Sequence, residues 1–170
     1  MINDTGYLFR EVQYFRQVWL WALLLAIAAS AIWGAVQQLV LGIPFGNNPA
    51  PDGAMIPLAT VIGVIFPVAF YFMNLTTEVH PDGVYYSFFP FHLRFRRIAF
   101  DDIKEYEMRK YSAIRDYGGW GIRYGRKGKA YNISGNRGLW LKMSDGSSIL
   151  FGSQRPEEFA AAIKQARGNA

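Results

Sequence analysis

Two stretches without charged side chains dominate the first half of the chain. No Asp, Glu, Lys or Arg occurs between Arg16 and Asp52, or between Asp52 and Glu78. Residues 18–41 and 54–74, within these stretches, are mainly apolar. A helix needs about 20 such residues to cross the hydrocarbon core of a bilayer. The pattern therefore predicts a hairpin of two transmembrane helices.

We place this hairpin at residues 17–75. Aromatic residues near its ends suit the membrane interface, and they are Trp19, Trp21, Tyr71 and Phe72. A cleaved signal peptide is one alternative, because residues 26–28 read Ala-Ile-Ala. However, the apolar run exceeds the roughly 7–15 residues of a signal core, and a second run follows it. A buried helical hairpin of a soluble protein is the other alternative, which two uncharged runs disfavour.

The charges that flank the two runs predict their orientation. Residues 42–53 contain neither Lys nor Arg, whereas residues 76–170 hold sixteen Lys and Arg against ten Asp and Glu. Basic segments stay on the cytoplasmic side of a membrane. We therefore expect a multi-pass protein of the cell (inner) membrane with both termini in the cytoplasm. The mixed aromatic and basic residues 1–16 predict an interfacial or juxtamembrane helix.

Small residues recur at every fourth position of both runs, and such stripes let helix backbones approach closely. Our favoured interpretation is that the two stripes pack against each other, and the alternative is that one faces another subunit. The helix-packing candidates are Ala22, Ala26, Ser30 and Gly34 in the first run, and Ala59 and Gly63 in the second.

The pattern changes after residue 75 to short apolar runs separated by turn signals, which predicts about six or seven strands. In residues 92–100, Leu93 and Phe95 alternate with Arg94 and Arg96, which predicts one buried and one basic face. Ser153 is a candidate N-cap for an amphipathic C-terminal helix with Pro156 in its first turn. We expect an α+β membrane protein in which residues 76–170 form a β-roll or barrel capped by this helix.

Three stretches resemble small prokaryotic membrane proteins with two transmembrane helices and a bacterial pleckstrin-homology-like (PH-like) domain. The stretches are FREVQYFRQVWLW, EVHPDGVYYSFFPFHLRFRRIAFDDI and YGRKGKAYNISGNRGLWLKMSDGSSILFGSQRPEEFAAAI. Together they cover roughly half of the chain. The resemblance implies a cytoplasmic PH-like domain in residues 76–170 with a binding or assembly role. It supplies no catalytic residues.

Little in the chain points to catalysis. Without cysteine there is no disulfide framework, Cys-based zinc site or thiol nucleophile. His80 and His92 lack ligand spacing, and Asp101-Asp102 is typical of a turn. The segment GGWGIRYGRKGK matches neither GxxxxGK[ST] nor GxGxxG. We expect no enzyme, no cofactor and no metal site. Uncharged spans also argue against ion transport.

Two basic clusters are the candidate ligand-binding or lipid-binding residues: Arg94, Arg96 and Arg97, and Arg123, Arg126, Lys127 and Lys129. Each Lys or Arg near an acidic leaflet contributes about 1 kcal/mol of attraction. A solvated surface that follows the positive-inside rule explains the same charge. Our leading hypothesis is a membrane-anchored module that binds a protein partner or self-associates. The alternatives are recognition of anionic phospholipid headgroups, or an accessory subunit of a larger membrane complex. The modest charge and the membrane tether argue against nucleic acid.

Overall fold

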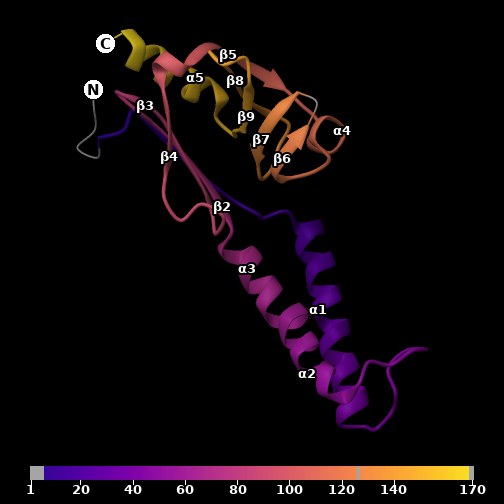
Figure 1. The fold of residues 1–170 in the computed structure, drawn as a ribbon. Helices are drawn as coiled ribbons and strands as arrows, with labels where there is room; N and C mark the ends of the chain where they lie inside the picture. Colours follow the sequence, from indigo (N-terminus) through magenta and orange to yellow (C-terminus); the bar gives the residue numbers. More distant parts are fainter. Residues whose placement is uncertain (1–5, 126, 169–170) are drawn as a thin grey trace. The chain divides into compact units, whose positions relative to one another are not determined.

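The computed structural model describes residues 6–125 and 127–168 (Figure 1). The chain divides into two compact units. The helical unit comprises residues 15–72, and the β unit combines residues 1–14 with residues 73–170. The chain therefore leaves the β unit after its first strand and re-enters it after the helices.

The helical unit contains two antiparallel helices. The first is α1 (Val18–Leu39), and the second runs without a break through α2 (Asp52–Thr60), η1 (Val61–Ile65) and α3 (Phe66–Phe72). By length and composition, both helices are apolar enough to cross a membrane.

The segment η1 is a π-helical turn, in which the Phe66 N–H bonds to the Val61 carbonyl. Pro67 explains it, because a proline has no N–H and its ring clashes with the carbonyl four residues earlier. Pro67 is thus accommodated by a local widening of the helix.

The first sheet of the β unit includes a strand that the sequence did not predict. Residues 9–14 form strand β1, so the prediction of a helix in residues 1–16 is wrong for this segment. Alternate residues Phe9, Glu11 and Gln13 are buried, the periodicity of a strand. All neighbours are antiparallel in the order β1-β2-β3-β4. The strands are β1 (Phe9–Tyr14), β2 (Asn74–His80), β3 (Gly83–Phe89) and β4 (Arg96–Ala99).

The second sheet has five strands in the order β5-β8-β9-β7-β6. Its pairs are antiparallel except β7 with β9, which is parallel. The described chain thus has more strands after the helices than the six or seven expected. The strands are β5 (Ile103–Lys110), β6 (Gly121–Gly125), β7 (Gly128–Asn132), β8 (Arg137–Met143) and β9 (Ser148–Gly152). The short helices η2 (Phe100–Asp102) and α4 (Ala113–Tyr117) flank β5.

The predicted C-terminal helix is confirmed as α5 (Pro156–Gly168), and it packs against strands of both sheets. The helix starts later than predicted, because Arg155 rather than Ser153 precedes its first residue and its carbonyl accepts from the Phe159 N–H at 3.1 Å. Ser153 lies in the turn before it, where its Oγ accepts from the Arg155 N–H at 3.0 Å. Phe159 stacks on Phe9 of β1 with ring centroids 5.0 Å apart, and it also contacts Phe151 of β9. The α+β architecture with a C-terminal helix is therefore as the sequence predicts.

Candidate functional site

The connection between β3 and β4 exposes a set of large apolar side chains. The sequence pattern predicted Leu93 and Phe95 as the buried face of a strand over residues 92–100. That prediction is wrong, since the strand comprises only Arg96–Ala99 and the Leu93 side chain is 81% exposed. Residues 89–95, here called the apolar loop, also present Phe89, Phe91 and Phe95 to solvent.

A buried histidine holds the middle of the apolar loop. His92 is only 8% exposed and lies edge-on to the rings of Tyr86 and Tyr131. Its backbone N–H donates to the Phe88 carbonyl at 2.8 Å, and its own carbonyl accepts from Ser87 Oγ at 2.8 Å. The Phe88 N–H points to His92 Nδ1 at 3.4 Å. Burial lowers the pKa of the imidazole, and the nearby charges of Arg96 and Lys129 lower it further. The backbone at His92 is therefore held in place, and the side chains on either side of it project from this anchored segment.

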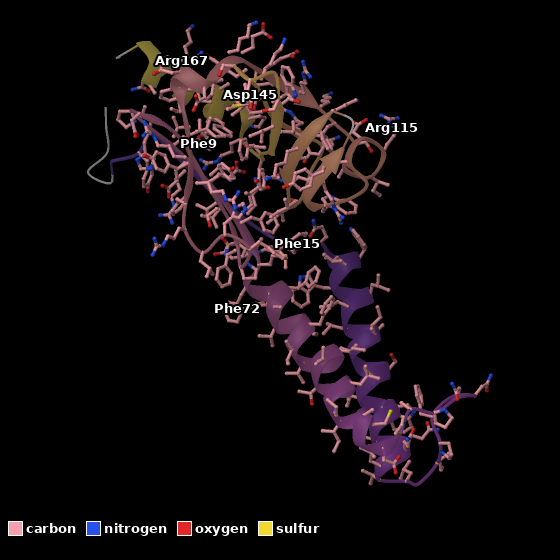
Figure 2. The ribbon with its side chains drawn as sticks, viewed as in Figure 1. Phe9, Phe15, Phe72, Arg115, Asp145 and Arg167 are labelled. Atoms are coloured by element: carbon pink, nitrogen blue, oxygen red, sulfur yellow. The ribbon has the colours of Figure 1, made fainter. Side chains whose placement is uncertain are left out.

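The strand register places the apolar loop at a defined end of the first sheet. Tyr14 pairs with Asn74, and Asn74 pairs with Phe89. The helical unit begins at Phe15 and ends at Phe72. Tyr14 immediately precedes Phe15, and Asn74 follows closely after Phe72. Phe15 and Phe72 lie at the same end of the helix pair (Figure 2). The apolar loop thus starts at the strand ends through which the chain enters and leaves the helical unit.

One residue from each predicted basic cluster takes part in a shared basic and aromatic site. The Lys129 ammonium lies 4.9 Å from the Tyr124 ring centroid and 4.8 Å from that of Tyr131. A hydrogen bond from Lys129 lowers the pKa of the exposed Tyr124 phenol, and the charges of Lys129 and Arg96 act in the same direction. Arg96 of β4 pairs with Tyr86 of β3, and the Tyr86 ring contacts both His92 and Tyr131. Arg96 and Lys129 of β7 therefore bring positive charge from both sheets to the neighbourhood of His92.

Arg97, Arg123 and Lys127, which also belong to the two clusters, make separate local contacts. Arg97 pairs with Asp82, with Nε and Oδ2 3.0 Å apart, and Arg123 Nε donates to the Trp120 carbonyl at 2.8 Å. Lys127 pairs with Asp116 at 3.0 Å. Arg94 is exposed on the apolar loop, whereas Arg126 lies outside the described residues. Basic residues that are close together in the sequence thus have separate partners in the structure.

The comparison with protein families covers both units. The chain matches the model of a family of unknown function (DUF6141) over residues 2–169. The chain belongs to this family. No curated protein and no solved structure matches it. Because the DUF6141 match includes β1, the helices and the rest of the β unit, all of these elements belong to the family's common sequence.

An open cleft of about 560 Å³ in this DUF6141 member lies beside α4. Its lining includes the cations Lys110, Arg115 and Lys127, together with Asp116 and Trp120. Asp116 accepts hydrogen bonds from the Ser112 N–H and from Lys127, and these two interactions lower the pKa of its carboxyl. Of these residues only Lys127 belongs to a predicted basic cluster, because no sequence motif connects the others.

The helix contact uses only one of the two predicted small-residue stripes. Ala59 and Gly63 are half-buried, and a Cβ added to Gly63 would come within 2.7 Å of Ile32 Cγ1. On α1 the buried residues are Leu24, Ala28 and Gly34. Gly34 adjoins the ring of Phe45 from the interhelical loop. Contrary to the favoured interpretation, the other predicted α1 positions are exposed: Ala22, Ala26 and Ser30.

No group of three His, Cys, Asp or Glu residues that could hold a metal ion occurs within the described residues. His80 instead forms a local pair with Glu78, with Nε2 and Oε2 2.9 Å apart. Asp101 and Asp102 lie in η2, the short turn ahead of β5.

Proposed function

We propose that this chain is a membrane-anchored binding module at the inner face of a prokaryotic cell membrane. Its two long helices cross the bilayer as a hairpin. Besides their length and hydropathy, their exposure supports this role, because only 22% of the most apolar part of α1 and 6% of that of the second helix is buried. The core hairpin of a soluble protein would bury its apolar side chains.

Charge and aromatic residues support a cytoplasmic β unit with both termini on that side. The segment between α1 and α2 has no Lys or Arg, whereas the β unit carries an excess of both. At the opposite end of the helices, Phe15 packs on Phe70, and Trp21 contacts Tyr71 while its indole N–H donates to the Phe15 carbonyl at 2.7 Å. Such clusters suit a membrane interface. We also propose a PH-like relationship for the two sheets and α5.

The ligand that best fits this module is the anionic headgroup layer next to its own helices. The observation that carries this proposal is the register of Tyr14, Asn74 and Phe89, which holds the apolar loop beside the entry and exit of the helical unit. Arg96, opposite Tyr86 in the β3–β4 pair, and Lys129, over the Tyr131 ring, supply positive charge near His92, since both rings contact the imidazole. A headgroup site of this kind needs electrostatic attraction and no catalytic group.

The preference for anionic lipid is testable on the full chain. Nanodiscs containing both phosphatidylglycerol and phosphatidylcholine would present the two lipids, and native mass spectrometry after extraction would count those retained. The variant R96E/K129E is expected to lose the preference for phosphatidylglycerol. The variant K104E/K164E makes the same change of charge at two exposed positions outside the site. Equal losses in both variants, or no preference in the parent, would refute headgroup recognition at this site.

Self-association or docking to a larger membrane complex is the second candidate function. It is favoured by the exposed row Ala22, Ala26 and Ser30, which the second helix does not cover. Small residues on a lipid-facing helix surface permit close approach of another helix. Replacing Ala26 with Leu should then lower the oligomeric mass in mild detergent or displace a co-purifying partner. Gly63 and Gly34 are unsuitable for this test because both already pack against other side chains of the helical unit. An unaltered mass and partner set would argue against assembly through this face.

A further inference from the structure

We propose that the apolar loop inserts into the interfacial layer of the bilayer that surrounds the chain's own helices. This inference rests on the proposed function, since it requires that the helices span the membrane. It goes further by assigning residues 89–95 to the acyl-chain boundary of the membrane. The charged headgroups would be contacted by Arg96 and Lys129.

The exposed surface of the loop is apolar to an unusual degree. Leu93 is 81% and Phe91 is 65% exposed, and Phe89 and Phe95 are exposed as well. Single exposed apolar residues are normal on a soluble surface, whereas a contiguous group of large ones marks an interaction site. The loop therefore requires a partner that is itself apolar.

The loop is also built to project these side chains. His92, between Phe91 and Leu93, is buried and held by hydrogen bonds to Phe88 and Ser87. Phe91 and Leu93 consequently project to solvent from a segment of backbone that is held in place. Insertion then requires little ordering of the backbone, and a low ordering cost favours binding.

The position of the loop identifies the bilayer as that partner. Neighbouring strands lie about 4.8 Å apart, so Phe89 is one strand spacing from Asn74. Asn74 begins β2 shortly after Phe72 ends the second helix. An interfacial segment needs to reach only about 5–10 Å into the boundary between headgroups and acyl chains.

The charges around the loop agree with this location. Arg94 is exposed between Leu93 and Phe95, and Arg96 follows directly. Long basic side chains near an apolar insertion extend their charged ends to the headgroups. Acidic residues are absent from residues 89–97 of the sequence, so nothing in this segment opposes an anionic leaflet.

The absence of native cysteine allows a direct test by single labelling. Leu93→Cys and, separately, Phe91→Cys would carry an environment-sensitive fluorophore in the full chain reconstituted in nanodiscs. Lipids with a quencher near the headgroup or deep in the acyl chain would report its depth. Ile27→Cys in α1 serves as the control for spanning. Pro81→Cys serves as the aqueous control, because His80 and Gly83 form the opposite end of the β2–β3 hairpin.

We expect the labels at positions 91 and 93 to lose most of their emission to the shallow quencher, and the label at 27 to the deep one. The label at 81 should respond only to aqueous iodide. Quenching at 27 without quenching at 91 or 93 would overturn loop insertion while leaving the proposed anchor intact. Iodide access at 27 would overturn both. Labels at 91 and 93 that resist iodide and lipid quenchers alike would mean that protein covers the loop, which also overturns insertion.

Discussion

Glu11, in the strand that precedes the first helix, accepts a hydrogen bond from Ser153, which precedes the last helix. Ser153 Oγ donates to the Glu11 carboxylate at 2.6 Å, and the Gln154 N–H donates to its other oxygen at 2.8 Å. Glu11 is only 5% exposed. A buried carboxylate is tolerated where such donors satisfy it. The two ends of the described chain are thereby tied together across the β unit.

Replacing Glu11 with Ala should destabilise the β unit. The change leaves the Ser153 hydroxyl and the Gln154 N–H without their acceptor, and hydrogen bonds to charged groups contribute about 1.5–3 kcal/mol each. Chemical unfolding followed by near-ultraviolet circular dichroism would measure the loss in free energy of unfolding. Glu107→Ala is the matched control, since Glu107 is exposed on β5 and surface changes typically stay within about 0.5 kcal/mol. Equal stability of both variants would contradict the assigned role of Glu11.

The register of β1 predicts that the β unit folds without the helical unit only if β1 is retained. Tyr14 lies opposite Asn74, so a turn of about two to four residues can replace residues 15–73 and close a hairpin. The joined chain, residues 6–14 linked to 74–168, should unfold cooperatively. A fragment of residues 76–170 lacks β1, with Phe9 and Glu11, and should be less stable and prone to aggregate through the exposed edge of β2. Denaturant titration with light scattering compares the two. If both fragments have the same midpoint, β1 is dispensable.

Strand β1 shows why part of the fold could not be predicted from the sequence. Two of its three buried side chains are Glu11 and Gln13, so its alternation is invisible to hydropathy. Gln13 is buried because its amide donates to the Gly152 carbonyl at 2.7 Å, a contact between residues far apart in sequence. The long apolar helices and the amphipathic α5, by contrast, follow from local periodicity alone. Where the local pattern was ambiguous, tertiary hydrogen bonds determined the secondary structure.

The candidate site was predictable in composition but not in arrangement. The basic residues were recognisable, yet the convergence of Arg96 with Lys129 depends on how two sheets pack. Leu93 and Phe95 had the spacing of a half-buried strand, but only Ile98 of the ladder Arg96–Ala99 is buried. Alternation identifies two faces of a segment without telling which of them meets a core.

Substitution at Gly63 should disturb the helix pair. A Cβ there would lie 2.7 Å from Ile32 Cγ1 and 3.5 Å from the Ala28 carbonyl oxygen. Gly63→Ala is expected to cost about 1–3 kcal/mol, the usual range for overpacking. Thermal unfolding of the helices in detergent would measure it. Gly53→Ala provides the control, because nothing lies within 4 Å of a Cβ at that helical position. A stability equal to that of the Gly53 variant would mean that the helices separate without cost.

Acidification should weaken the β unit through His92. Burial lowers the pKa of His92, and the Arg96 and Lys129 charges add to that effect, so the folded state favours the neutral imidazole. Its unfolded pKa is about 6.5. Between that value and the lower folded pKa, the unfolded chain binds more protons, and the stability from neutral His92 is lost as pH falls below about 6.5. Above about 6.5 it is fully present.

The variant His92→Asn isolates this effect, because an amide oxygen can still accept from the Phe88 N–H but does not titrate. The advantage of the parent in free energy of unfolding should shrink between about pH 7.5 and pH 5.5. His80 is present in both proteins and cancels in the difference. Curves that stay parallel over this range would show that His92 does not couple protonation to folding.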